Sequence, residues 1–277
     1  AEKGEVPTPY EGLEGFIDTL KSIYDKFADR DLKALAMSAP GRIDANTGYF
    51  YTSGALKYIT GVNLTEKLKD VIPLPFGVEN DAKAAALAEL WKGSMVGIDN
   101  GLILVLGTGI GGALVINGKL YRGSTFAAGE LSCFPTIMEG IPFRKDSIWT
   151  KKASTSALVN QYAENLGKDP AELNGRILFE AANNGDEIAV KTVEKFAEYV
   201  ASGIMGLQFC IDVRRVAIGG GISKQPILME LVDSKLSEMF TSYQGNLPIS
   251  KPEVMACEFG NDANMIGALY HYLYELN

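Results

Sequence analysis

The chain has 277 residues, 47% of them hydrophobic, and a formal net charge of -8. This length suits two lobes of ordinary domain size with a cleft between them. Because no run of Lys or Arg is dense enough to follow a phosphate backbone, nucleic acid is disfavoured as a partner. No run of about 18 apolar residues is long enough to cross a membrane, and residues 1–5 lack the apolar core of a signal peptide, so a soluble cytoplasmic protein is expected.

The cysteine and histidine content limits metal and nucleophilic chemistry. Cys133, Cys210 and Cys257 are far apart and form no CxxC pair, and His271 is the single histidine. Neither a disulfide framework nor a Cys/His zinc site is supported. His271 lies in an apolar C-terminal segment that is typical of a helix, and we interpret it as a structural or solvated residue rather than a catalytic base.

The first elements indicate a helix followed by a buried strand. Apolar residues at spacings of three and four predict an amphipathic helix over about residues 10–28. Residues 34–38 then predict a strand that ends in the turn at 39–41. Residues 42–44 are therefore expected in a loop at the carboxyl end of the strand, where ligands bind in open α/β sheets.

The next elements alternate strand, helix and strand. A strand at 76–79 is followed directly by a helix at 81–91, which is rich in Ala, Leu, Glu and Lys. Gly93 is expected at the C-terminal cap of this helix. The strand at 102–106 then enters the glycine cluster 107–112.

The second half of the chain is mainly helical. Residues 113–121 predict a hairpin, because Asn117-Gly118 between apolar arms is typical of a type I′ turn. A long amphipathic segment at 193–207 precedes a strand at 215–218. The alternation of strands and helices predicts α/β lobes rather than an all-β sandwich.

The glycine cluster indicates a phosphate site between two strands. Gly107, Gly109 and Gly112 match the G-x-G-x-x-G pattern of dinucleotide-binding loops, but that pattern requires a helix after the glycines and a hairpin is predicted here. Backbone N–H groups of such a turn, with the Thr108 hydroxyl, are suited to a terminal phosphate. An ordinary glycine-rich hairpin is the alternative.

The triplet Glu79-Asn80-Asp81 places three polar side chains at the end of an apolar strand. Asp81 is interpreted as a base that accepts the proton of an attacking hydroxyl, with Asn80 orienting a neighbouring hydroxyl. The alternative for Asp81 is a helix cap, a role that Asp and Asn fill routinely.

Two further segments are candidates for ligand contact. Glu130 follows three small residues that let the backbone approach a ligand, and a surface glutamate is the alternative. Gly219-Gly220-Gly221 after the strand at 215–218 is suited to an adenine or its ribose, and a plain turn is equally compatible with the sequence.

Together these motifs resemble the ROK family of sugar kinases and repressors. The resemblance covers almost the entire chain and is carried by residues 78–82, 106–112, 117–119, 128–131 and 218–223. It implies an α/β protein with the actin-like ATPase (ribonuclease H-like) fold, in which two lobes close over a sugar and ATP with Mg²⁺. The small lobe is expected at 1–93, completed by a helix at 262–277, and the large lobe at 94–261.

The resemblance also implies a role for each matching residue. Asp81 is expected to be the catalytic base and Asn80 and Glu130 sugar ligands. The remaining expected substrate-binding positions are Gly41, Ser53 and Cys133, and the nucleotide-binding positions are Gly107, Thr108, Gly109, Gly111, Gly219, Gly220 and Gly221.

The chain departs from the family pattern around its zinc site. Cys133 stands where most members have a histidine, no cysteine cluster follows, and the position of a second sugar-binding glutamate falls near Thr150. No zinc or other resident protein-bound metal is therefore expected. With residues 53–59, this pattern is similar to the zinc-free subgroup that includes β-glucoside kinases.

A second departure is that the family's Asp-x-Gly-Gly-Thr phosphate loop has no match here. Either the sequence lacks the true N-terminus, or the protein has lost half of its phosphate clamp. The winged-helix extension of ROK repressors is also absent, which argues against a DNA-binding regulator. The resemblance further implies a homodimer.

The expected activity is ATP-dependent phosphorylation of a sugar primary hydroxyl, O6 of glucose or of a β-glucoside. A catalytically impaired sugar-binding or regulatory protein is the main alternative, and an NAD-dependent oxidoreductase comes third. The missing second glutamate and histidine are expected to leave room for a β-linked substituent, on which Trp149 or Phe143 would stack. The alternative is that both aromatics are core residues.

Overall fold

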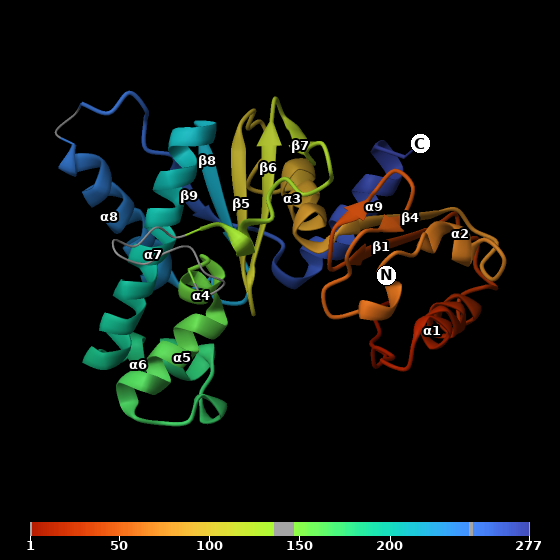
Figure 1. Cartoon of the computed structure of the whole chain (residues 1–277), viewed down its shortest axis with the longest axis horizontal. Coiled ribbons are helices and arrows are strands. Elements are labelled where there is room, and N and C mark those ends of the chain that lie inside the picture. Colours follow the sequence, from red (N-terminus) through yellow and green to blue (C-terminus); the bar gives the residue numbers. More distant parts are fainter. Residues whose placement is uncertain (1, 136–146, 244–245, 277) are drawn as a thin grey trace. The chain divides into compact units, whose positions relative to one another are not determined.

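The protein is described from a computed structural model that covers residues 2–135, 147–243 and 246–276. The chain divides into two compact units (Figure 1). Unit 1 comprises residues 1–87 and 264–277, and unit 2 comprises residues 88–263. The boundary between them falls inside helix α3 (Asp81–Lys92), whereas the small lobe is expected from the sequence to end after this helix, at residue 93.

Unit 1 is built on two parallel strands, β1 (Leu35–Ala39) and β4 (Phe76–Asn80). Their register pairs Ala39 with Asn80, so the carboxyl ends of both strands meet at one edge. The apolar side of helix α1 (Leu13–Asp25) packs with this sheet, as its periodicity predicts. The predicted helix and both predicted strands are confirmed.

The prediction of a loop at 42–44 is wrong. Ile43–Asp44 forms strand β2, which pairs antiparallel with β3 (Tyr49–Phe50). The physical reason is burial, because Ile43 and Phe50 are register partners whose residues are 2% and 0% exposed. The 3₁₀ helix Lys57–Ile59 and helix α2 (Leu64–Leu68) follow.

The C-terminal helix α9 (Ala263–Tyr274) packs closely on β4 and α3 within unit 1. A Cβ atom at Gly77 of β4 would lie 3.3 Å from the Tyr272 ring, and one at Gly267 of α9 would collide with the Ala84 carbonyl oxygen. Glycine at these two positions therefore lets the elements approach without a gap.

Unit 2 contains a five-stranded sheet in the order β7-β6-β5-β8-β9. β8 pairs parallel with β5 and β9, while β6 and β7 continue from β5 as an antiparallel meander. At the turn between β6 and β7, Asn117 and Gly118 both have positive φ, 53° and 71°, which confirms the predicted hairpin turn. The strands are β5 (Gly101–Leu106), β6 (Ile110–Ile116), β7 (Lys119–Tyr121), β8 (Arg215–Gly219) and β9 (Glu253–Ala256).

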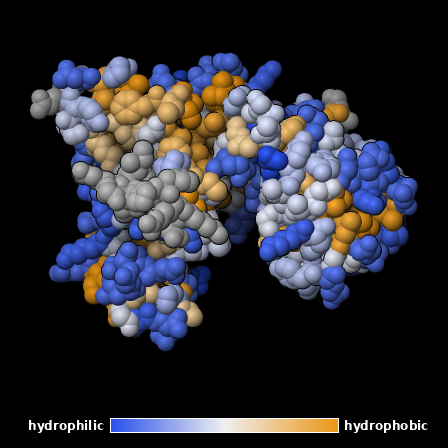
Figure 2. All heavy atoms as spheres, viewed as in Figure 1, coloured by the Kyte–Doolittle hydropathy of each residue, from blue (hydrophilic) through white to orange (hydrophobic). Residues whose placement is uncertain are grey.

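Helices α4 to α8 complete unit 2 together with short 3₁₀ turns. In Figure 1, α4, α5 and α6 gather beside the long helix α7. Helix α8 packs against α7 and also contacts β9. In Figure 2, apolar side chains gather over the sheet of this unit and over the end of α7 beside it. No described helix is both long and apolar enough to span a bilayer. The helices are α4 (Thr150–Ala153), α5 (Thr155–Leu166), α6 (Gly175–Asn183), α7 (Glu187–Ile211) and α8 (Pro226–Ser242), and the 3₁₀ turns are Leu131–Cys133, Pro170–Glu172 and Gly260–Asp262.

Candidate active site

The junction between β4 and α3 holds Asn80 in a fixed orientation. The Asn80 Oδ1 atom accepts a hydrogen bond of 3.1 Å from the Lys83 amide, so Asn80 caps the helix. Its Nδ2 group donates to the Gly41 carbonyl oxygen at 2.9 Å and to Asp81 Oδ1 at 3.0 Å. The capping role that the sequence left open for Asp81 is therefore filled by its neighbour.

The Asp81 carboxylate lies at the start of α3 and is partly withdrawn from solvent. Its Oδ1 atom accepts from the Ala82 amide at 2.8 Å and from the Asn80 side chain. Burial raises the pKa of Asp81, while these two hydrogen bonds and the charge of Lys83 act in the opposite direction. A carboxylate that is oriented, partly desolvated and raised in basicity is suited to accept a proton.

Two further predicted sugar-binding positions, Gly41 and Ser53, lie in unit 1 beside this junction. Gly41 has a φ of 112°, and a Cβ atom there would collide with the Thr52 carbonyl oxygen. Ser53 is buried, and its hydroxyl donates to the Leu56 carbonyl at 2.6 Å and lies 2.6 Å from the Thr60 hydroxyl. These bonds fix the loop that covers the backbone of Gly41.

Hydrogen bonds to residues 150 and 155 hold the glycine turn of unit 2 in place. The Gly107 carbonyl accepts from the Thr155 amide at 2.9 Å, and the Thr150 hydroxyl accepts from the Ile110 amide at 3.1 Å. Within the described residues, the amides of Thr108 and Gly109 donate no hydrogen bond. Two backbone donors are thus available at the tip of the turn.

Two adjoining cavities open next to this turn. One, of about 380 Å³, is lined by the turn and by α5; the other, of about 710 Å³, extends along α6. They share Thr155, Gly175 and Gly221. Sequence reasoning missed their helical walls, because α5 and α6 carry no glycine motif. The lining residues outside the predicted motifs include Asn160, Asn174, Arg176, Phe179, Glu180 and Asn183.

The three consecutive glycines after β8 have different surroundings. Gly219 is buried within the strand end. Gly220 has a φ of 98°, and a Cβ atom there would collide with the Leu106 carbonyl oxygen. Gly221 would meet no atom within 4 Å, and it lines both cavities. The segment is therefore a tight turn that also forms the wall of a cavity.

The Ala-Gly-Glu segment packs beneath the first glycine cluster through its own glycine. Gly129 has a φ of 82°, and a Cβ atom at Gly112 would lie 2.6 Å from the Gly129 carbonyl oxygen. Gly111, the neighbour of Gly112 on β6, is half-buried. Glu130 is exposed and precedes the 3₁₀ turn that ends at Cys133, which is also exposed.

The proposed stacking role of Trp149 is wrong. Its indole is 0% exposed, donates through Nε1 to the Tyr199 carbonyl at 2.9 Å, and lies against the backbone of Gly203. Trp149 is a core residue, as the alternative interpretation held. Phe143 lies outside the described residues. Among the described residues, no group of potential metal ligands includes a cysteine.

Comparisons with known proteins identify the family. The ROK family pattern matches residues 2–274. The chain is 32% identical over 249 residues to the β-glucoside kinase of Listeria monocytogenes, covering 89% of this chain and 81% of that protein.

Solved structures agree with this match. A ROK family protein of Streptococcus pneumoniae in complex with sucrose has a TM-score of 0.85 and 31% identity, covering 98% of this chain and 89% of that chain. A ROK glucokinase of Streptomyces griseus in complex with glucose and AMPPNP has a TM-score of 0.79 and 25% identity, covering 95% and 88%. The chain belongs to the ROK family and has the actin-like ATPase fold of its kinases.

Proposed function

We propose that the protein transfers the terminal phosphoryl group of ATP to a primary hydroxyl of a sugar, with O6 of glucose or of a β-glucoside as the acceptor. The observation that carries the proposal is Asp81, whose carboxylate is held by Asn80 and by the amide of Ala82 without serving as the helix cap. The relatives named β-glucoside kinase and the glucokinase complexed with glucose and AMPPNP support it.

In this proposal Asp81 accepts the proton of the attacking hydroxyl as the oxygen forms its bond to phosphorus. Asn80 hydrogen-bonds the neighbouring sugar hydroxyl, and Glu130 is the second sugar ligand carried over from the family pattern. Because the transition state of phosphoryl transfer is loose, most of the acceleration comes from positioning and charge neutralisation. The contribution of the base itself is about 10²- to 10⁴-fold.

The nucleotide is proposed to bind in the cavities of unit 2. In this proposal the amides of Thr108 and Gly109 donate to its terminal phosphates, and a flat ring approaches the backbone at Gly221, where a Cβ atom would meet nothing within 4 Å. Arg176 and Phe179 line the larger cavity, where the adenosine is proposed to lie. Mg²⁺ that accompanies ATP would supply charge neutralisation on the transferred group.

With Trp149 in the core, we propose Tyr51 as the platform for a β-linked substituent. Tyr51 is 40% exposed and directly precedes Thr52, whose carbonyl touches Gly41. The Arg42 guanidinium lies 4.5 Å from the centre of its ring, and the ring centre of Tyr49 lies 5.0 Å away in an edge-to-face arrangement. These contacts fix the ring without burying it, which suits stacking on a sugar or aryl group.

We also propose that the protein is a homodimer in the cytoplasm and holds no structural zinc, as the family resemblance and Cys133 suggest. Light scattering checks the mass. Metal analysis of the purified protein is expected to find no stoichiometric zinc. About one zinc per chain, with loss of stability on chelation, would contradict this part of the proposal.

The test is ADP formation by the full-length protein with glucose, cellobiose, an aryl β-glucoside, N-acetylglucosamine and mannose. We expect turnover with glucose or a β-glucoside, and a product whose phosphate is on O6 by ³¹P NMR. Binding of a sugar without any ADP formation would instead favour the sugar-binding or regulatory alternative.

A further inference from the structure

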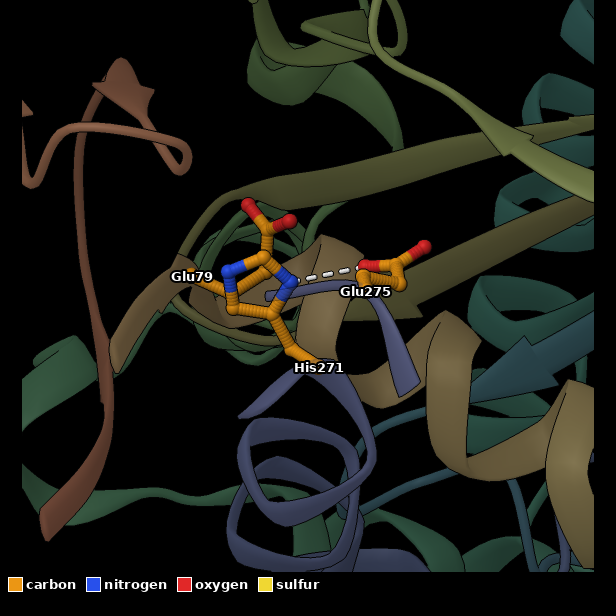
Figure 3. Close-up of side chains that lie close together, drawn as sticks. All are labelled: Glu79, His271 and Glu275. Carbon is orange, nitrogen blue, oxygen red and sulfur yellow. Dashed lines mark hydrogen bonds and ion pairs between the residues drawn. The ribbon is translucent and has the colours of Figure 1, made fainter. Parts of the chain in front are cut away.

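A cluster of three ionisable side chains adjoins the β4–α3 junction and is not part of the proposed reaction. Glu79 comes from β4, and His271 and Glu275 come from the C-terminal segment, where they are four residues apart (Figure 3). Their ligand-type atoms all lie within 4.8 Å of one another. Glu79 is 0% exposed and His271 is 1% exposed. We call these three residues the brace.

Hydrogen bonds fix both nitrogens of the His271 ring. Nδ1 lies 2.7 Å from Glu275 Oε2, and Nε2 lies 3.2 Å from the carbonyl oxygen of Ala45. A carbonyl oxygen only accepts, so Nε2 carries a hydrogen and donates to Ala45. The second hydrogen bond joins Nδ1 to the Glu275 carboxyl group. The ring orientation is therefore set from both sides.

The brace touches the candidate sugar site at two points. The Glu79 Oε1 atom accepts from the backbone amide of Asn80 at 2.7 Å. His271 holds Ala45, while the Asn80 side chain holds Gly41. The segment 41–45 is thus tied at one end by the proposed sugar ligand and at the other end by the brace.

A role in packing alone does not require these residue types. Burial of an ionisable group costs free energy unless every polar atom is paired, and apolar residues of similar size usually fill a core at lower cost. A buried polar network instead fixes one arrangement of the segments that it joins. Here the joined segments carry Gly41, Asn80 and Asp81.

We propose that His271 is a positioning residue for the acceptor sugar, acting through Ala45 and Glu79. This inference rests on the proposed function, because it assigns Asn80 and the 41–45 segment to sugar binding. It predicts that disturbing the brace weakens the sugar interaction and leaves the nucleotide interaction, which is assigned to unit 2, unchanged.

A divalent cation is the competing occupant of the brace. Nitrogen and oxygen ligands lie about 2.0–2.2 Å from an ion such as Zn²⁺ and do not hydrogen-bond each other. The 2.7 Å distance between Nδ1 and Glu275 Oε2 is that of a hydrogen bond. The geometry therefore favours a hydrogen bond over metal binding, and the experiment includes both outcomes.

Two substitutions separate the contacts of the ring. His271→Gln keeps a side-chain amide near the position of Nε2 and can still donate to Ala45. His271→Asn reaches only the position of Nδ1 and loses that bond. Loss of one such bond is expected to raise the sugar KM about 10-fold. His271→Gln is expected to stay closer to the parent protein, and the ATP KM to remain unchanged in both.

Glu79→Gln and Glu66→Gln form a matched pair in the same unit. Glu79→Gln keeps an oxygen for the Asn80 amide but replaces the buried carboxyl group by an amide, whereas Glu66 is 61% exposed and pairs with Lys69. Sugar KM is expected to rise for Glu79→Gln alone. If activity in the variants falls only in proportion to their folded fraction, with sugar KM unchanged, the brace is merely structural and the proposal is wrong.

The single histidine provides a direct readout in the untagged protein. The ring resonances of His271 are expected to shift on addition of glucose or cellobiose, and Nδ1 and Nε2 can be followed by ¹⁵N NMR. No shift at saturating sugar contradicts the proposal. Stoichiometric Zn²⁺, Mn²⁺ or Ca²⁺ that is lost in His271→Asn also contradicts it.

The two proposals fail separately. If the parent protein binds sugar but forms no ADP, the kinase function is contradicted, and the sugar Kd from calorimetry is compared in place of KM. A Kd that rises in His271→Asn then still supports the positioning role of the brace. If all brace variants phosphorylate sugars with the same sugar KM as the parent protein, the kinase function is supported and the positioning role of the brace is contradicted. Absence of both sugar binding and turnover removes both proposals.

Discussion

Unit 1 and unit 2 present their candidate ligand groups in different ways. At the β4–α3 junction of unit 1, the ligand groups are side chains, and Asn80 and Asp81 are held by hydrogen bonds of 2.8–3.1 Å. At the glycine turn of unit 2, the candidate ligand groups are backbone amides, and those of Thr108 and Gly109 donate to no acceptor among the described residues. Side chains select a particular hydroxyl, whereas a bare backbone is suited to phosphate.

This contrast predicts different responses to mutation. Substitutions in unit 1 should change the chemical step or the sugar KM with the fold intact. Substitutions of glycine in unit 2 should first change the backbone, and hence stability and nucleotide binding.

The largest effect is expected for Asp81→Asn. Asparagine can accept the same hydrogen bonds from Ala82 and Asn80 but cannot take the proton, so kcat should fall by about 10²- to 10⁴-fold. Because Asn80 caps α3, Tm should barely change. Steady-state kinetics and calorimetry check both parts, and retained turnover would remove Asp81 from the mechanism.

Gly220→Ala tests whether the tight turn after β8 requires glycine for the stability of unit 2. The new Cβ collides with the Leu106 carbonyl and the residue keeps a positive φ, so the folded state should lose about 1–3 kcal/mol. The matched control is Gly221→Ala, whose Cβ meets nothing within 4 Å. Denaturant unfolding should show a loss for the first variant only; equal losses would contradict the packing argument.

Tyr51→Ala should act on the substrate rather than on the fold. Loss of an aromatic stack is expected to cost about 0.5–1.5 kcal/mol, which raises KM for cellobiose or an aryl β-glucoside about 2- to 10-fold. KM for glucose should not change. Tyr121→Ala, at an exposed tyrosine of unit 2, is the control. Equal effects on glucose and glucoside would remove Tyr51 from the acceptor site.

The raised pKa of Asp81 predicts two pH effects. The acid limb of kcat/KM should fall at a pH above the ordinary aspartate value of 3.8, because the base is lost on protonation. The folded state also binds this proton more tightly than the unfolded state. Its contribution to stability is therefore largest at low pH and decreases as the pH rises through the raised pKa.

The stability effect is small and is measured as a difference between parent and Asp81→Asn. Between pH 4 and 7 the parent should lose stability relative to the variant. A difference that does not depend on pH would contradict the assignment of a raised pKa to this carboxyl.

Local patterns in the sequence predicted the elements that present the site. The strand and helix around Asn80, the hairpin at Asn117-Gly118 and the strand at 215–218 were confirmed, because each depends on propensity or turn chemistry within a few residues. The family resemblance supplied the roles of these positions.

Contacts between distant segments were not predictable. Trp149 is buried because Gly203 on α7 leaves room for its ring, and nothing near Trp149 in the sequence shows this. His271 contacts Ala45, which is 226 residues away in the sequence, so the brace could not be predicted from the sequence. Ile43 was placed in a loop because a two-residue strand has no periodicity of its own.

Phosphoryl transfer itself is the most direct test of the central claim. The full-length protein, ATP with Mg²⁺, and glucose or cellobiose should give ADP and an O6-phosphorylated sugar in ³¹P NMR spectra, and Asp81→Asn should give neither within the same time. Sugar binding by calorimetry with no phosphorylated product from the parent protein, or equal product from parent and Asp81→Asn, would contradict the account.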